Sequence, residues 1–389
     1  MTRDERYMQR CIELAKLGAG NVAPNPMVGA VLVHDDRIIG EGYHQKYGEA
    51  HAEVHAIDQA LLRQADDDSD LIDKSTLYVS LEPCAHFGKT PPCADLIIRH
   101  KIPKVVIGCR DPFKEVNGKG IEKLKAAGVE VELGILEKEC KELNKRFFTF
   151  HTQARPYIIL KWAETGDGFI ASLASKGGAS PSPSEGGVLE SSKREDISNL
   201  VRVESPRLEG EGARLLISNE YTNRLVHKWR SEEAAILVGT NTVEHDNPEL
   251  TTRLWPGHSP IRLVVDMHLR LPSSLKVFNQ QVRTIIFNNV KHEELGNLLY
   301  YQVTEDVSLV HQIVNALHQL KIQSVIVEGG ARLLQLFIDE GMWDEARVIR
   351  NEQLAIGKGL PAPRLHNSVT TNQLYIFSDS VELHKNING

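Results

Sequence analysis

Four residues in the amino-terminal third of the sequence have the types and order of a catalytic metal site: His51, Glu53, Cys84 and Cys93. One imidazole and two thiolates are enough protein ligands for a catalytic zinc ion, which keeps its fourth position for water. Zinc lowers the pKa of bound water towards about 7, so hydroxide forms at neutral pH. We therefore predict zinc ligands at His51, Cys84 and Cys93, with Glu53 passing a proton to a departing amine.

This arrangement is typical of zinc-dependent nucleobase deaminases, in which a glutamate that is not a ligand moves the proton. One feature departs from the general pattern, because eight residues separate the two cysteines where the signature has two. His55 lies one helical turn after His51, but we do not expect it to bind metal, because the cysteines already complete the ligand set. The other cysteines, Cys11, Cys109 and Cys140, fit small buried apolar residues.

The elements that must position these residues alternate between strands and helices, which indicates a layered α/β fold. In the first half, hydrophobic periodicity predicts strands at 28–33, 76–81, 105–108 and 129–133, and helices at 4–18, from 51, from 93, at 121–127 and at 137–150. After Arg155-Pro156 the pattern restarts. It predicts strands at 157–163, 215–218, 234–239, 261–266, 282–288 and 324–330, and helices at 223–229, 310–320 and 331–341. We expect domains at 1–150 and 151–389, with a flexible Ser-, Gly-, Glu- and Pro-rich insertion at 172–212.

Composition fits an ordinary globular protein of 389 residues, with 41% hydrophobic and 25% charged residues. The net charge is −7, so no basic footprint for nucleic acid is present. No apolar run reaches the 18 residues of a membrane span, and the amino terminus lacks the apolar core of a signal peptide. Five unevenly spaced cysteines fit a reducing compartment. We expect a cytoplasmic, homo-oligomeric protein that binds a small molecule, with no nucleic-acid or membrane partner.

Three segments of the first half strongly resemble the deaminase half of the bifunctional riboflavin-biosynthesis deaminase/reductase family: APNPMVGA at 23–30, HAEVHA at 51–56 and LEPCAHFGKTPPC at 81–93. In that family the longer insert between the cysteines is usual. The resemblance implies a cytidine-deaminase-like domain with three α/β/α layers. It also supports substrate binding by Asn25, with His44, His86 and Lys89 as further candidates for substrate or phosphate contact.

The second half resembles the reductase half of the same family in residues 160–171, 225–253 and 325–334. The resemblance implies a fold similar to dihydrofolate reductase. No GxGxxG follows a strand, so an ordinary dinucleotide-binding turn is not indicated. Glu328-Gly-Gly330 precedes a helix, whose amino terminus favours a phosphate. By resemblance, NADPH is held by Ala163, Thr242, Asp246, Gly330, Ala331 and Arg332. Substrate is held by Arg230, Leu250, Arg253, Glu328 and Lys161, with Asp167 nearby and the arginines donating to a phosphate.

The resemblance implies two consecutive reactions on one phosphorylated pyrimidine. A diaminopyrimidinone ribosylamino phosphate first loses its ring amine, and NADPH then reduces the ribose of the product to a ribityl chain. One departure bears on the second step: Leu216 replaces a tryptophan of the family, and Arg214 stands where a small polar residue is usual. Two alternatives remain, namely a zinc deaminase of a nucleoside or tRNA base, and a deaminase whose second domain only binds ligand or assists assembly.

Overall fold

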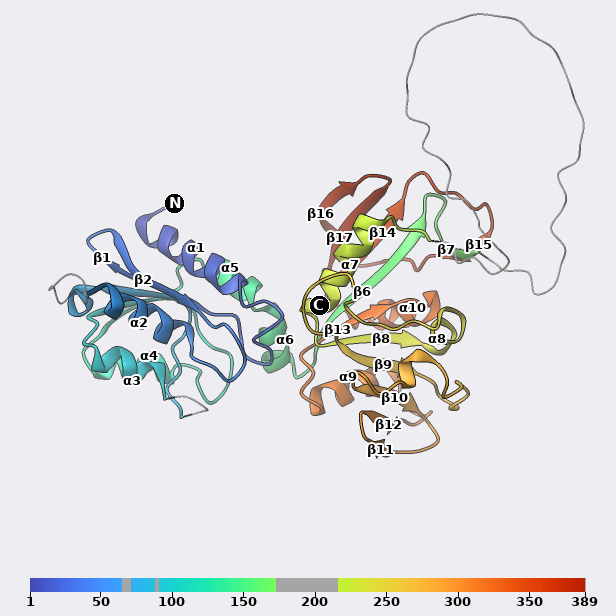
Figure 1. The fold of residues 1–389 in the computed structure, drawn as a ribbon, viewed down its shortest axis with the longest axis horizontal. Helices are drawn as coiled ribbons and strands as arrows, with labels where there is room; N and C mark the ends of the chain where they lie inside the picture. The colour runs from blue at the N-terminus through green and yellow to red at the C-terminus, as the bar shows by residue number, and fades with distance from the viewer. Residues whose placement is uncertain (65–70, 88–90, 173–215, 389) are drawn as a thin grey trace, which may run out of the picture.

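The computed structural model describes residues 1–64, 71–87, 91–172 and 216–388, and its two large sheets lie side by side (Figure 1). A five-stranded sheet belongs to the first half and a ten-stranded sheet to the second. Helix α6 (Lys145–Gln153) lies between them. The domain boundary expected at residue 150 falls inside this helix and stays a prediction. Lys89, Arg214 and nearly all of the expected insertion at 172–212 lie outside the described residues.

The first sheet has the order β2-β1-β3-β4-β5, with β1 antiparallel to both of its neighbours and β3, β4 and β5 parallel. Its strands are β1 (Gly29–His34), β2 (Arg37–Tyr43), β3 (Thr76–Leu81), β4 (Lys104–Cys109) and β5 (Glu130–Leu133). Its helices are α1 (Arg3–Lys16), α2 (Ala52–Gln64), the 3-10 helix η1 (Ile72–Lys74), α3 (Cys93–Arg99), α4 (Lys119–Ala126) and α5 (Glu137–Leu143).

Apolar residues on both faces of the first sheet explain its three layers. One face packs α2, α3 and α4 against residues such as Leu77 and Val105, and the other packs α1 and α5 against Val106. Strands β3 and β4 therefore carry nearly continuous apolar runs, as expected for parallel strands that are covered on both faces. The α/β/α architecture predicted for the first half is confirmed.

The second sheet has the order β11-β12-β10-β9-β8-β13-β6-β14-β17-β16 and is parallel from β12 to β14. Its strands are β6 (Tyr157–Thr165), β8 (Ala235–Gly239), β9 (Ile261–Val265), β10 (Thr284–Asn288), β11 (Glu293–Leu295), β12 (Leu298–Gln302), β13 (Ser324–Glu328), β14 (Glu345–Asn351), β16 (Ser368–Ile376) and β17 (Asp379–Asn386). Its helices are α7 (Glu220–Glu232), α8 (Thr240–Asp246), the 3-10 helix η2 (Lys276–Phe278), α9 (Leu309–Gln319) and α10 (Ala331–Asp339). A separate pair joins β7 (Phe169–Ser172) and β15 (Gly359–Pro361).

The structure differs from the sequence-based expectation in three ways. The helical segment at 137–150 is two helices, α5 and α6, which meet at Asn144. The strand expected at 215–218 is wrong for its described residues, because 216–218 lie in no helix or strand and the Leu216 side chain is 67% exposed. The sequence patterns did not predict helix α8 or strands β2, β7, β11, β12, β14, β15, β16 and β17. Most of β16 is exposed, so it lacks a clear apolar alternation.

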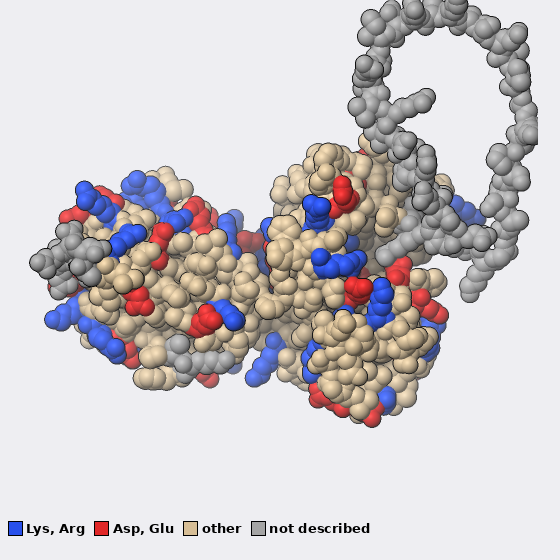
Figure 2. Space-filling view, viewed as in Figure 1, with Lys and Arg blue, Asp and Glu red and all other residues tan. Residues whose placement is uncertain are grey.

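Charged side chains of both signs are mixed over the two halves of the face shown in Figure 2. On that face the described residues form no continuous basic stripe. In the described part of the chain, no helix combines the length and apolar character needed to span a membrane.

The two halves are held together at α6 by buried and half-buried ion pairs. Arg146 makes a two-pronged contact with the buried Glu233 at the end of α7, and its Nε lies 2.8 Å from Oε2. Lys145 Nζ lies 2.7 Å from Glu345 Oε2 in β14. Planar guanidinium–carboxylate pairs restrict orientation as well as distance, so these contacts fix α6 against the second sheet.

A buried carboxylate anchors the loop that carries the second predicted zinc ligand. Glu82, which is 4% exposed, accepts hydrogen bonds from the backbone N–H groups of Asp111, Gly118, Gly120 and Ile121 at 3.0–3.3 Å. A side chain on Gly120 would collide with the carbonyl oxygen of Pro83, because a Cβ there would lie 1.9 Å from it. The close packing of α4 against Glu82-Pro83 therefore sets the path of the chain into Cys84.

We expect Glu82→Ala to lower the free energy of unfolding by about 3 kcal/mol or more, because it leaves four buried backbone donors without an acceptor. Urea unfolding followed by circular dichroism measures this loss. Glu122→Ala, on the exposed side of α4, is the matched control and should change stability by less than about 1 kcal/mol. Equal effects of the two substitutions would contradict the anchoring role of Glu82.

Candidate active sites

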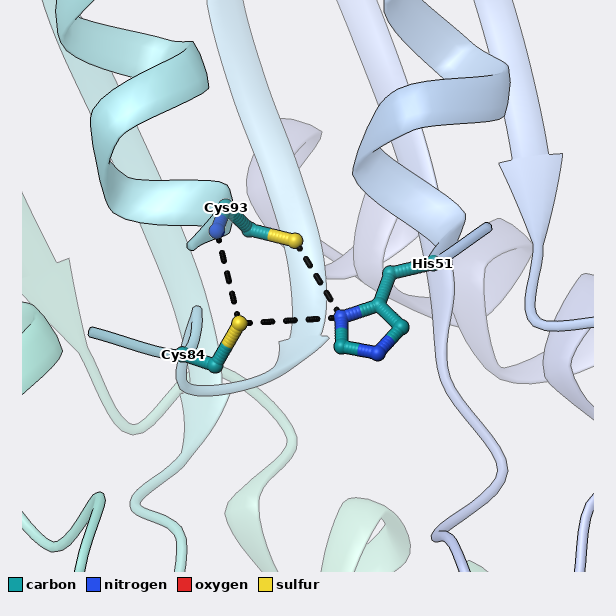
Figure 3. Close-up of side chains that lie close together, drawn as sticks. All are labelled: His51, Cys84 and Cys93. Carbon is teal, nitrogen blue, oxygen red and sulfur yellow. Dashed lines mark hydrogen bonds between the residues drawn. The ribbon is translucent and has the colours of Figure 1, made fainter. Parts of the chain in front are cut away.

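His51, Cys84 and Cys93 come together although they lie in three separate segments (Figure 3). His51 immediately precedes α2, Cys84 follows β3 by three residues, and Cys93 is the first residue of α3. The imidazole and both thiol groups point toward one another in the close-up view. Their ligand atoms all lie within 4.8 Å of one another. They are the one such cluster of three or more His, Cys, Asp or Glu residues in the described part of the chain.

The geometry of these atoms fits a tetrahedral zinc ion. His51 Nδ1 lies 3.3 Å from Cys93 Sγ and 3.6 Å from Cys84 Sγ. Zn–S and Zn–N bonds of about 2.3 and 2.0 Å at tetrahedral angles place neighbouring ligand atoms about 3.5–3.8 Å apart. Hydrogen bonding from Cys93, together with His51, lowers the pKa of the Cys84 thiol. The thiolate, which is the form that binds metal, is therefore favoured at Cys84.

Glu53 lies in the first turn of α2 and is 3% exposed. Burial raises the pKa of its carboxyl group, whereas the neighbouring His51 opposes that rise. Its side chain also hydrogen-bonds with Cys93. A buried carboxyl group beside the three ligands can accept and return a proton, which is the role predicted for Glu53.

His51, Cys84 and Glu53 line a cavity of about 710 Å³, and Cys93 is not among its lining residues. Asn25 and His44, both expected near substrate, also line it, and Asn25 Nδ2 lies 3.2 Å from His44 Nε2. His44 Nδ1 lies 3.0 Å from the carbonyl oxygen of Ala50, and its ring meets the His51 ring edge-on at 5.3 Å. Burial lowers the pKa of His44, so its neutral form is favoured. The structure thus brings these sequence-predicted residues into one pocket.

Two other histidines of the first half differ in position. His86 lines the cavity, and its Nδ1 is buried without a hydrogen-bond partner among the described residues. His55 is not part of the metal cluster, because it packs on β2, where a Cβ at Gly42 would lie 2.5 Å from His55 Cβ. Our expectation that His55 is not a ligand agrees with this placement.

The second half gathers charged residues at the carboxyl end of β13. Arg230 donates through Nε to Glu328 Oε1 at 2.9 Å and through Nη2 to Oε2 at 2.6 Å. Lys161, paired with Glu328 across β6 and β13, has its Nζ 3.8 Å from Oε2. Burial alone would raise the pKa of Glu328, but Arg230 and Lys161 hold it at about 2. The carboxylate therefore stays ionised.

This pairing changes what Arg230 can offer to a phosphate. We expected its planar fork to bind substrate, but Nε and Nη2 are already occupied by Glu328. Arg253 is different, because it is exposed and its side chain is in no ion pair or hydrogen bond among the described residues. Leu250 is buried in the core with its backbone at a φ of 56°, which leaves backbone atoms as its means of contacting a ligand.

Gly329 and Gly330 form a turn without side chains between β13 and α10, with φ values of 79° and 70°. Thr242 of α8 packs against this turn, and a Cβ on Gly329 would approach its Cγ2 to 3.0 Å. The following residues, Ala331 and the exposed Arg332, begin α10. Backbone N–H groups at such a helix start suit an anionic phosphate. The donor set therefore fits the phosphates of a dinucleotide.

The other residues expected near the cofactor lie at separate points of the same half. Ala163 is half-buried in β6, and Asp246 ends α8. Asp167, which was expected near the substrate residues, accepts backbone hydrogen bonds from Ile356 at 3.0 Å and Gly357 at 2.7 Å, so it stabilises the turn before β7.

Sequence reasoning missed His227, which lies on α7 one turn before Arg230 and is 4% exposed. Burial, with Arg230 and Arg253 nearby, lowers its pKa to about 4, so the ring is neutral. Its position one helical turn from a predicted substrate residue could have indicated that it lies near the same site, because residues three apart share a helix face. Glu82 was missed as well, although it directly precedes Pro83-Cys84.

Comparisons with known proteins agree with the family resemblance of both halves. Residues 1–109 match the cytidine and deoxycytidylate deaminase zinc-binding region, and residues 156–351 match the RibD C-terminal domain. Riboflavin biosynthesis protein RibD of Aquifex aeolicus is 38% identical over 91% of this chain and 90% of its own length. The Escherichia coli protein of the same name is 32% identical over 88% and 86%.

Solved structures show the same arrangement over the whole chain. A deaminase/reductase from Thermotoga maritima superposes with a TM-score of 0.80 at 34% identity and covers 99% of both chains. RibD of Acinetobacter baumannii has a TM-score of 0.79 at 28% identity and covers 98% of both. Neither alternative, a nucleoside or tRNA deaminase or a second domain without catalysis, is supported by these relatives. The chain therefore belongs to the family of bifunctional riboflavin-biosynthesis enzymes that join a zinc-dependent deaminase to an NADPH-dependent reductase.

Proposed function

We propose that the first site deaminates 2,5-diamino-6-(5-phosphoribosylamino)pyrimidin-4(3H)-one and that the second reduces the ribose of the product. The observation that carries the proposal is the convergence of His51, Cys84 and Cys93 beside the buried Glu53. The Thermotoga maritima relative is described as a diaminohydroxyphosphoribosylaminopyrimidine deaminase and 5-amino-6-(5-phosphoribosylamino)uracil reductase, which supports this choice of substrates. The homo-oligomeric state and cytoplasmic location stay predictions.

In the first reaction, His51, Cys84 and Cys93 hold zinc, which supplies an acidified water as nucleophile when bound. Glu53 accepts a proton and delivers it to the amine that leaves the ring. Its burial suits this task, because a raised pKa favours the protonated carboxyl group that can deliver a proton to the leaving amine. Asn25, whose amide contacts the neutral His44, orients the pyrimidine in the cavity.

In the second reaction, NADPH supplies the hydride, while the protein supplies orientation and charge. We propose that Gly330, Ala331 and Arg332 hold its phosphates, together with Thr242, Asp246 and Ala163. Arg253 binds the substrate phosphate, whereas Arg230 keeps Glu328 ionised and in place. Lys161, Glu328 and the backbone at Leu250 then line the substrate side of this site.

The two activities can be measured separately in one protein. Purified protein is mixed with the pyrimidine substrate and NADPH, and both ammonia release and the loss of NADPH absorbance are followed. We expect both signals, with NADPH consumption after ammonia release. Ammonia without NADPH consumption would contradict the reductase assignment, and neither signal from zinc-loaded protein would contradict the substrate.

We expect Glu53→Gln to keep zinc while deamination slows by at least about 100-fold, because the metal ligands remain but the proton carrier is lost. Elemental analysis and ammonia release measure the two effects. Glu49→Gln is the matched control in the same cavity, since Glu49 is exposed and pairs with Lys46 at 3.7 Å. Substantial activity in Glu53→Gln would rule out this role for Glu53.

Arg253→Ala and Arg230→Ala should change different properties of the protein, namely substrate affinity and stability. Arg253→Ala should raise the reductase KM by roughly 10- to 100-fold, the value of one charged hydrogen bond, with deamination unchanged. Arg230→Ala should instead lower the free energy of unfolding by about 3 kcal/mol, because it removes the main partner of a buried carboxylate. Steady-state kinetics and urea unfolding distinguish them. Equal loss of both activities in Arg253→Ala would show that the sites are not separate.

A further inference from the structure

The wall of the deaminase cavity is completed by residues of the second half. Beside the first-half residues described above, the cavity is lined by His318 and Gln319 at the end of α9, and by Lys321 and Gln323 before β13. We refer to residues 318–323 as the α9–β13 corner. The volume of the cavity, about 710 Å³, lies within the range of about 300–1,000 Å³ that is usual for small-molecule pockets.

Specific contacts hold this corner against the first half. Gln323 Nε2 donates a hydrogen bond of 2.8 Å to the carbonyl oxygen of Pro24, the residue that precedes Asn25. The His318 ring contacts Phe150 of α6 with ring centroids 4.7 Å apart. The corner therefore cannot move away from the cavity without breaking the Gln323–Pro24 hydrogen bond and the His318–Phe150 contact.

The charges around the cavity are unevenly distributed. Its lining contains the carboxyl groups of Glu49, Glu53, Glu82 and Asp111. Lys321 is the one lysine or arginine among its described lining residues. Lys321 is exposed, and within the described ranges its side chain makes no hydrogen bond or ion pair. Among the described lining residues, a substrate phosphate that enters this cavity therefore meets one unpaired lysine, and that lysine comes from the second half.

We infer that Lys321 binds the phosphate of the pyrimidine substrate during deamination, so that the reductase half supplies a substrate-binding residue to the deaminase. The proposal rests on the deaminase function proposed above. An ammonium group at the rim can bind a phosphate as a point charge while the pyrimidine ring occupies the zinc end. His318, on the same corner, offers a ring nitrogen to the same end of the substrate.

The chain contains a matched control for Lys321 in the other half. Lys101 follows α3 as Lys321 follows α9, with φ values of 54° and 59°. In both segments, the backbone N–H of the lysine donates a hydrogen bond to the carbonyl oxygen three residues earlier. An isoleucine follows each lysine, and its backbone N–H donates to the carbonyl oxygen five residues earlier. Both lysines are exposed, but only Lys321 lines the cavity. Replacing either one by alanine therefore changes backbone strain and helix-end charge equally.

We expect Lys321→Ala in the full-length, zinc-loaded protein to raise the KM for deamination by about tenfold or more, with kcat nearly unchanged. Lys321→Arg should keep most of the affinity, because it keeps the charge. Lys101→Ala should leave KM unchanged. NADPH-dependent reduction of the deaminated product should be the same in all four proteins. Ammonia release at varied substrate concentration measures the first three effects.

A dephosphorylated substrate separates phosphate binding from a general effect on the pocket. The wild type should lose affinity when the phosphate is removed, whereas Lys321→Ala should bind both substrates about equally. This result is expected if the Lys321 ammonium group and the substrate phosphate interact directly, because removing either one then removes the same interaction. The inference is overturned if Lys321→Ala has the wild-type KM, or if its KM rises equally for both substrates. It is also overturned if Lys89→Ala alone abolishes the preference for phosphate. Failure of the wild type to release ammonia would instead contradict the proposed function.

Discussion

The deaminase half is organised around a requirement of tetrahedral zinc coordination: one imidazole nitrogen and two sulfurs must lie about 3.5–3.8 Å apart. Three segments bring these atoms within 4.8 Å of one another because they end or begin at the same edge of the first sheet. His51 precedes α2, Cys84 follows β3, and Cys93 begins α3. The buried Glu82 fixes the middle segment by accepting four backbone hydrogen bonds. The ligand positions therefore depend on the packing of α4 as much as on their own helices.

A second constraint governs the reductase half, where a carboxylate is buried. Glu328 remains ionised because Arg230 donates two hydrogen bonds to it and Lys161 lies 3.8 Å away. An unpaired charge there would be costly. The guanidinium fork of Arg230 is consequently not free for a ligand, which leaves Arg253 as the exposed cation of the pair. Burial, with Arg230 and Arg253 nearby, keeps His227 neutral, although Glu328 opposes this effect.

The halves are more than two enzymes on one chain. The corner after α9 closes the deaminase cavity, and Gln323, His318 and the ion pairs of α6 keep it there. Consecutive reactions give a chemical reason for joining the two domains. The shared cavity wall adds a structural reason, because the first pocket is complete only in the presence of the second half.

The sequence by itself determined the α/β class and identified the candidate zinc ligands and the candidate proton carrier, because these depend on residue type, order and local periodicity. It also placed most helices and strands, since parallel strands covered on both faces carry continuous apolar runs. Only the tertiary structure decided which charges neutralise one another and which segments share a wall. Arg230 and Glu328 are 98 residues apart, and Pro24 and Gln323 are 299 apart. No local pattern encodes such contacts, because they arise when distant elements pack and burial makes each polar group find a partner.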